Sequence, residues 1–472
     1  MNNKPLSPRK FSRRQFLRWG AQGLAITALT GGALSTLSRL NPAQAAPLSP
    51  GRYPTASLPP ARPPAQASSF IRLAATDGYF SLPGRRIFPT PGNVSSNPDP
   101  EVRRAAIFAV PDEGNNGLYG FGFVEAAVSD TIAEVIDRHK GNVRWPSPII
   151  GVEAETDVYI TVTNPGLVGR PDLDDAHTLH WHGFRNPNAI FDGVPEVSIS
   201  VPPTRDFPYF FRPAAAGVGT YMYHCHFEDS EHVQMGMDGI VYIYPTGQPN
   251  RAYADASTTF DRHYTLLLNE VDTSPHDGLI NVQEFVWSDY DPNYWVINGR
   301  SFPDTILSDS EIVGTELEFR QPVSSLIQAV GGENILLRMI NLGYQQQAMQ
   351  MLGIRMRVVG HDAAFLGNLA YDTHTIYIGP GEGRDIMFEA PGYNSKLPGG
   401  VDDAGPYNVY WFKNHHPQYL VNGAGDNDNL ASDEPINDIF GNAAPLGGQI
   451  TQVRVYASLP NQTRPNQTFP AV

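Results

Sequence analysis

Cysteine is almost absent from this chain of 472 residues, since Cys225 is the only one. A single thiol excludes any intramolecular disulfide, so the fold depends on its core whatever the redox state of its compartment. Positive charge is also scarce, with 33 Lys and Arg against 48 Asp and Glu. The net charge of −15 argues against nucleic acid and anionic membrane surfaces as partners and favours cationic ones.

The first 45 residues carry an export pattern. They hold the twin-arginine sequence SRRQFL at 12–17, a weakly apolar stretch at 19–37 and a small-residue cleavage site at 43–45. Glycines within the apolar stretch make it a poor membrane span. We therefore expect residues 1–45 to be a twin-arginine signal peptide and the protein to be periplasmic or secreted.

Turn and strand signals organise the rest of the chain. Residues 46–69 are rich in proline and predict a linker. After them, runs of β-branched and aromatic residues recur between clusters of Gly, Pro, Asn and Asp, for example at 157–163 and 263–268. A break at 245–249 separates two such regions. The pattern predicts an all-β fold of two Greek-key β-sandwich domains in tandem, at 70–249 and 255–472.

Histidines gather around the one cysteine in two short segments. These are HTLHWHG at 177–183 and HCHFEDSEHVQMGM at 224–237. Successive side chains of a strand point to opposite faces of a sheet, so the histidines on either side of Cys225 face away from it. By the same rule His177 faces away from the other two histidines of its segment. Alternation therefore predicts two separate sites.

The first predicted site joins one thiolate, two imidazoles and a thioether. Its members are His177, Cys225, His232 and Met237. Sulfur ligands stabilise Cu(I) and nitrogen ligands stabilise Cu(II), so this set is typical of a blue-copper (type 1) electron-transfer centre, with Met235 as a competing axial ligand. Zinc prefers a tetrahedral set without a thioether. We expect His232 to approach the surface, beside an acidic run at 228–231, and to be the point of electron entry.

The second predicted site consists of imidazoles alone. Its members are His180, His182, His224 and His226. Histidine pairs two residues apart on neighbouring strands make a nitrogen-rich pocket for copper. Because two of these histidines flank Cys225 in the chain, an electron that enters at the thiolate has a short covalent route to the second site.

On these motifs, and on DGVP at 192–195, the sequence resembles the multicopper oxidase family over residues 100–460. Blue-copper nitrite reductases are relatives on the same cupredoxin fold. The resemblance implies tandem cupredoxin-like domains and a copper oxidoreductase that takes electrons from a small-molecule or metal-ion reductant and passes them to dioxygen. It implies type 1 copper at the first site, type 2 copper at His180 and a type 3 pair at the other histidines of the second site. Asp192 matches an acid that helps to move protons to dioxygen.

The second half departs from the family pattern. A full trinuclear cluster needs a second set of histidines, and the corresponding stretches at 344–351 and 407–416 lack that set and a cysteine. In nitrite reductases a neighbouring subunit donates a histidine to type 2 copper, and His415 resembles that ligand, while His361 resembles a histidine that assists protonation. We therefore expect a homo-oligomer. Two alternatives stay open: a nitrite reductase-like enzyme with copper between subunits, and a non-catalytic type 1 copper electron carrier.

Overall fold

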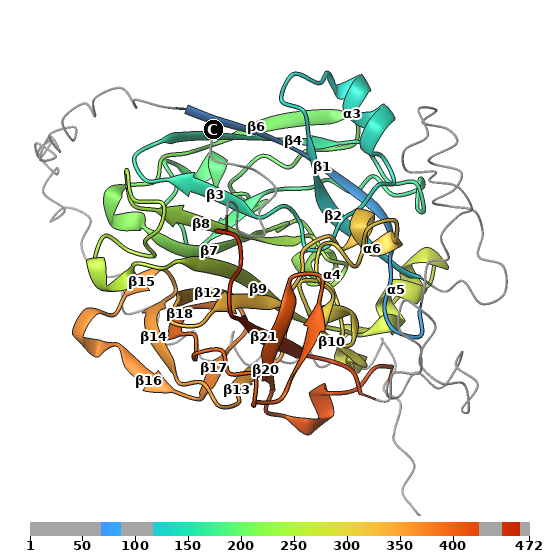
Figure 1. Ribbon diagram of the computed structural model, residues 1–472. Coiled ribbons are helices and arrows are strands. Elements are labelled where there is room, and N and C mark those ends of the chain that lie inside the picture. The colour runs from blue at the N-terminus through green and yellow to red at the C-terminus, as the bar shows by residue number, and fades with distance from the viewer. Residues whose placement is uncertain (1–67, 86–116, 424–445, 463–472) are drawn as a thin grey trace, which may run out of the picture. The chain divides into compact units, whose positions relative to one another are not determined.

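The computed structural model describes residues 68–85, 117–423 and 446–462, all of which belong to one compact unit, Ala65–Val472. The predicted signal peptide and nearly all of the predicted linker lie outside the described residues. The described chain forms four β-sheets that make two sandwiches, with few and short helices (Figure 1). The predicted all-β fold class is confirmed.

The first sandwich has two sheets of four strands each. In strand order, one sheet consists of β2 (Leu118–Ala126), β1 (Ser68–Phe80), β4 (Asp157–Asn164) and β6 (Arg205–Phe211). The other consists of β3 (Ile150–Glu153), β8 (Asp238–Tyr244), β7 (Gly219–His224) and β5 (His180–His182). Apolar side chains of both sheets, among them Phe121, Ile160 and Val241, form one buried core. The strand β1 starts two residues before the predicted domain because Ser68 and Ser69 pair in parallel with β4.

The second sandwich repeats this plan with longer sheets. One sheet consists of β10 (Tyr294–Ile297), β9 (Arg262–Val271), β12 (Asn334–Asn341), β18 (Glu382–Glu389), β14 (Met356–His361) and β15 (Ala364–Phe365), with β16 (Tyr371–Thr373) paired to β14. The other consists of β11 (Ile327–Val330), β21 (Ile450–Tyr456), β20 (Gly405–Asn414), β13 (Gln347–Met351) and β17 (Thr375–Ile378), with β19 (Gly399–Asp402) paired to β20. A second core, which includes Leu266, Met349 and Val453, fills the space between them.

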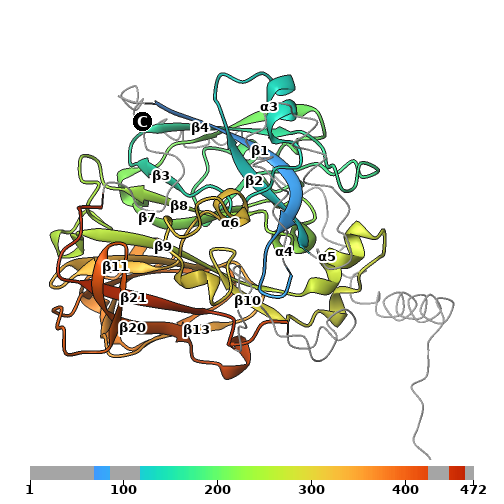
Figure 2. The same ribbon diagram turned by 45° about the vertical axis from the view of Figure 1, so that its right-hand side comes forward.

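A third apolar cluster joins the two sandwiches. Met222 of β7 and Ile240 of β8 pack with Leu267 of β9 and Ile340 of β12. Figure 1 shows β7 and β8 beside β9 and β12, and Figure 2 again shows β7 and β8 beside β9. The sheet that carries the histidine segments is therefore supported on its outer face by the second sandwich.

The helices among the described residues are α3 (Ile132–His139), α4 (Asp229–Gln234), α5 (Thr273–Ile280) and α6 (Glu316–Arg320). Thr131 and Glu134 form a reciprocal capping box that starts α3. The helix α4 matters for the site because it carries His232 between the strands β7 and β8. None of the described helices is long and apolar enough to cross a bilayer.

Candidate metal centre

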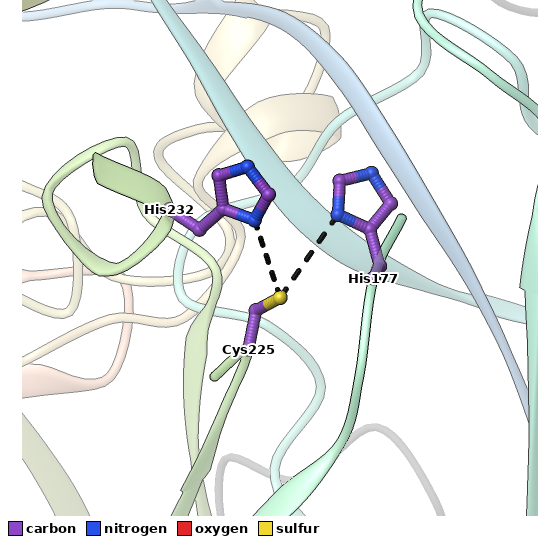
Figure 3. A group of neighbouring side chains, drawn as sticks. All are labelled: His177, Cys225 and His232. Carbon is purple, nitrogen blue, oxygen red and sulfur yellow. Dashed lines mark hydrogen bonds between the residues drawn. The ribbon is translucent and has the colours of Figure 1, made fainter. Parts of the chain in front are cut away.

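Cys225 and two histidine rings form a compact group inside the first sandwich (Figure 3). The Sγ atom of Cys225 lies 3.2 Å from Nδ1 of His232 and 4.0 Å from Nδ1 of His177. Donors bonded to one metal ion at about 2.0–2.3 Å lie roughly 3–4 Å from each other. All three side chains are fully buried. The group therefore has the donor set and the spacing of a single metal site shielded from water.

The backbone around Cys225 fixes the sulfur. The N–H of Cys225 donates to the carbonyl of Met237 over 3.1 Å, and the N–H of Thr178 donates to Sγ over 3.4 Å. Met237 is fully buried in the same core as Cys225. The ring of Phe121 packs edge-on against His232, with the ring centres 5.4 Å apart. The predicted axial methionine, Met237, thus holds the backbone of Cys225 through its carbonyl and lies in the same core.

Two of the buried rings, His177 and His224, titrate as metal binding requires, whereas the pKa of His232, despite its burial, is raised to about 10 by its neighbours Cys225 and Asp175. Burial, with a smaller effect of the charge on His232, lowers the pKa of His177 well below its ordinary value. Burial also lowers the pKa of His224 to about 3. At neutral pH both rings are therefore neutral, which is the state in which imidazole binds a metal ion.

Four more histidines lie on the opposite side of the β5 and β7 strands. His180 pairs directly with His224 in the antiparallel ladder. Ligand atoms of His180, His182 and His224 lie within 4.8 Å of one another. The ring of His226 is 5.1 Å from that of His180, centre to centre. Strand alternation therefore separates the two groups as the sequence predicted, and Cys225 connects them through the main chain.

Asp192 contacts the second group from a loop after β5. Nδ1 of His180 donates to the main-chain carbonyl of Asp192 over 2.6 Å, which leaves Nε2 as the ligand atom. A carboxylate oxygen of Asp192 lies 3.8 Å from the same Nδ1 and accepts a hydrogen bond from Asn186. The structure thus places the predicted proton-transfer residue beside a predicted copper ligand.

Comparisons with known proteins agree with this geometry. A sequence profile described as multicopper oxidase matches residues 136–248, which contain both histidine segments. Laccase-5 of Arabidopsis thaliana is 24% identical over 287 residues, covering 60% of this chain and 44% of that protein. The stretch that carries both histidine segments is thus similar to multicopper oxidases. Copper is the cofactor that this similarity and the Cys and His donor set support.

Two further comparisons concern copper oxidases. The iron multicopper oxidase fer1 of Mycosarcoma maydis is 29% identical over 148 residues, covering 29% of this chain and 22% of that protein. The crystal structure of the blue copper oxidase from Nitrosomonas europaea aligns with a TM-score of 0.54 and 22% identity, covering 83% of this chain and 86% of that one. The chain thus spans less than half the length of these curated relatives, and the structural likeness extends across both cupredoxin-like sandwiches.

Two predicted site residues lie away from both groups in the single chain. His361, at the end of β14, is partly exposed, and its Nε2 lies 3.2 Å from the hydroxyl of Tyr371. His415 follows β20, is exposed, and has Nδ1 3.4 Å from the side-chain oxygen of Gln350. Neither belongs to a metal-ligating group found among the described residues. Their proposed roles stay predictions.

The surroundings of His232 differ from the sequence expectation. His232 is fully buried, so the prediction that it approaches the surface is wrong. Its Nε2 lies 3.8 Å from a carboxylate oxygen of Asp175, and ligand atoms of Asp175, Glu231 and His232 lie within 4.8 Å of one another. Asp175 was not predicted, because it precedes the first histidine segment and no local motif points to it. Glu231 belongs to the predicted acidic run, and the structure places it beside Asp175 and His232.

The second sandwich contains a counterpart of the first site without metal ligands. In the first sandwich, the N–H of Cys225 donates to the carbonyl of Met237. In the second, the N–H of Asn414 donates to the carbonyl of Gln449 at the equivalent strand ends, over 2.8 Å. The parallel ladders agree, since Ile150 pairs with Val241 just as Ile327 pairs with Val453. Asn414 therefore occupies the place of the cysteine, and Gln449 that of the methionine.

Three buried side-chain amides occupy this counterpart site and hydrogen-bond to one another. The strand register puts Gln347 in the place of His177. The side-chain amide of Asn414 donates to the side-chain oxygen of Gln347 over 2.8 Å and to that of Gln449 over 2.7 Å. Gln347 donates in turn to Glu270 over 3.0 Å. We call Gln347, Asn414 and Gln449 the amide triad. It satisfies its own polar groups and leaves no donor set for copper.

We expect Glu270→Gln to flatten the dependence of unfolding free energy on pH. Burial raises the pKa of Glu270 to about 7 from its ordinary value of 4.5, despite hydrogen bonds from Tyr344 and Gln345. Between these values the folded chain keeps a proton that the unfolded chain has lost, so stability falls as pH rises, by about 3 kcal/mol in total. Urea unfolding across this window measures the slope. The exposed Glu389→Gln is the control, and an equal slope in both variants contradicts the prediction.

Proposed function

We propose that the chain is an exported copper oxidoreductase that takes electrons from a reducing substrate at the type 1 site and reduces dioxygen at the histidine site. Copper bound at both places supplies the one-electron redox chemistry. One observation carries the proposal: Cys225 faces His177 and His232, while the residues directly before and after it belong to the histidine site. An oxidase needs this coupling of electron entry to electron delivery.

The chain's own groups provide a second connection between the sites. His224 donates from Nδ1 to the carbonyl of Cys225 over 2.8 Å. The route from sulfur to the histidine site therefore runs through the covalent backbone and through this hydrogen bond. Burial of His177, Cys225 and His232 excludes water from the first site, which limits the reorganisation that each electron transfer requires.

Asp175 and Glu231 support a cationic metal ion as the reductant. Asp175 lies 3.8 Å from Nε2 of His232, Glu231 has a carboxylate oxygen within 4.8 Å of a ring nitrogen of His232, and Nε2 itself is buried without a hydrogen bond. Carboxylate oxygens attract and bind divalent cations, whereas a neutral phenol gains little from them. The net charge of the chain points the same way. The relative named as an iron oxidase is compatible with this substrate class.

The test compares two reductants by their oxygen consumption. With copper-loaded protein, Asp175→Asn combined with Glu231→Gln will raise KM for ferrous ion about tenfold, because roughly 1.4 kcal/mol of charge attraction is lost. KM for a neutral phenol will stay unchanged. Asp172→Asn, which alters an acid of the same loop that pairs with Arg170, is the matched control. Equal effects on both reductants exclude the cation site, and the absence of oxygen uptake with either reductant overturns the oxidase proposal.

Asp192→Asn will lower kcat for oxygen reduction about 100-fold, the scale of a lost proton-transfer group. The main-chain carbonyl that orients His180 is retained, so copper content will not change. The blue absorption will also persist, because Asp192 contacts the histidine site and not Cys225. Glu196→Gln, an exposed acid of the same loop, is the control. Unchanged turnover in the Asp192 variant removes this carboxylate from the mechanism.

A further inference from the structure

The number of imidazoles available to the histidine site is fixed by the chain. All 13 histidines occupy positions that the structure describes. Only the two metal-site groups of the first sandwich bring several of them together: the pair beside Cys225, and the four of the second group, which are His180, His182, His224 and His226. His263 is buried in β9, where it stacks on Phe260, and His276 is buried in α5, where it donates to the carbonyl of Tyr119. The site therefore has one set of ligands where the family's cluster has two.

The internal repeat shows which residues stand where a second set would be. His180 pairs with His224 in the first sandwich, and Gln350 pairs with Lys413 at the same register in the second. The turns that follow agree, because Gly183 and Gly353 both have positive φ, at 73° and 83°. The four counterparts of the histidines are Gln350, Leu352, Lys413 and His415.

These counterparts cannot hold further copper ions. Leu352 has no donor atom and is 39% exposed. The side chain of Lys413 ends in an ammonium group, which has no lone pair for a metal and repels a dication. His415 is the one imidazole on this face, so a second copy that presented the same face would add a single ligand. Copper held by imidazoles in a cluster needs more donors than this.

Three of the four histidines of the first sandwich are instead arranged for one ion, with the fourth, His226, beside them. Nδ1 of His182 lies 3.3 Å from Nε2 of His224, and a ligand atom of His180 lies within 4.8 Å of both. Separate ions would each require their own set of donors, whereas these three converge on one position. The trinuclear cluster implied by the family resemblance does not fit this donor set.

We infer that the histidine site binds a single copper ion, and that the protein therefore reduces dioxygen by two electrons to hydrogen peroxide instead of by four electrons to water. The second half of this inference rests on the proposed function. Copper held at Cys225 and copper held at the histidine site would supply two one-electron centres per chain, which matches the two electrons required. Dioxygen accepts these electrons and two protons to become hydrogen peroxide, and the reductant loses the same two electrons.

Copper counting tests the site independently of activity. The loaded full-length protein will contain about two copper ions per chain, and both will be visible by electron spin resonance because neither is paired with a neighbour. His224→Ala will lose one ion and keep the blue absorption. Cys225→Ser will lose the absorption and keep the ion held by the histidines. Three or more ions per chain, or copper that is silent in spin resonance, overturns the single-ion site.

Peroxide measurement tests the product. Catalase added after the reductant-driven reaction will return about half of the oxygen consumed, as expected when all of that oxygen becomes peroxide. No return of oxygen means that water is the product and overturns the two-electron assignment. If no oxygen is consumed but two spin-visible ions are present, the proposed oxidase function fails while the single-ion site stands. The two failures are thus distinguishable.

Discussion

Cys225→Ser will abolish the intense visible absorption of the copper-loaded protein and lower reductant-dependent oxygen uptake by more than about 100-fold, beyond the usual effect of losing a residue next to a metal ligand. The sulfur lies 3.2 Å from Nδ1 of His232. The residues directly before and after Cys225 in the chain, His224 and His226, belong to the histidine site. Serine removes the soft donor that stabilises Cu(I) and gives the centre its charge-transfer colour. Absorption spectra, copper content and oxygen uptake of the same preparations measure the effect.

Two methionine variants provide the control for this experiment. Met235 and Met237 are both buried in the core that contains Cys225, so their replacement by leucine disturbs packing to a similar degree. Met235→Leu will leave the spectrum unchanged. Met237→Leu will keep the colour but raise the reduction potential, because a weak axial thioether is lost. A colourless copper-loaded wild type, or a blue Cys225→Ser variant, contradicts the assignment of a type 1 centre.

Arg338→Met will lower the free energy of unfolding by about 3–5 kcal/mol, the usual cost of leaving a buried charge without its partner. Arg338 is fully buried and donates to Thr220 over 2.9 Å, and its Nη1 lies 3.7 Å from a carboxylate oxygen of Asp385. Thr220 belongs to the first sandwich, whereas the other two residues belong to the second. The substitution therefore weakens the contact between the sandwiches as well as leaving Asp385 unpaired.

Urea unfolding measures this loss. Arg355→Met is the control, because Arg355 is 67% exposed where it pairs with Asp372, and we expect its removal to cost less than about 1 kcal/mol. The double variant Arg338→Met with Asp385→Leu will recover part of the stability, since no buried charge remains. Equal losses in the Arg338 and Arg355 variants contradict the proposed role of the buried ion pair.

The sequence allowed both groups of candidate donors to be predicted because each lies within two short segments with a strand-like alternation, and the structure brings these segments together. Strand alternation separates Cys225 from His224 by a rule that needs no tertiary knowledge, and the spacing to His232 lies within one connection. The fold class followed from strand and turn chemistry for the same reason, as strands such as β4 and β9 carry their own apolar and β-branched patterns.

Burial and long-range contacts could not be predicted in this way. His232 follows an acidic run that is typical of a surface, yet its ring lies against Phe121, which is more than one hundred residues earlier in the chain. Asp175 reaches the same ring through a loop without a motif. The amide triad also left no local signal, because glutamine and asparagine are ordinary residues and Gln449 lies 35 residues after Asn414. Only a comparison of the strand pairing in the two sandwiches shows that these amides occupy the positions of the metal ligands.

The amide triad makes copper supply matter unequally to the two halves. A centre closed by its own hydrogen bonds is complete as soon as the polypeptide folds, whereas the half with the thiol gains its last stabilising bonds only on metallation. Copper starvation should therefore remove stabilising bonds from the amino-terminal sandwich and none from the amide triad, so that any loosening of the protein begins around Cys225.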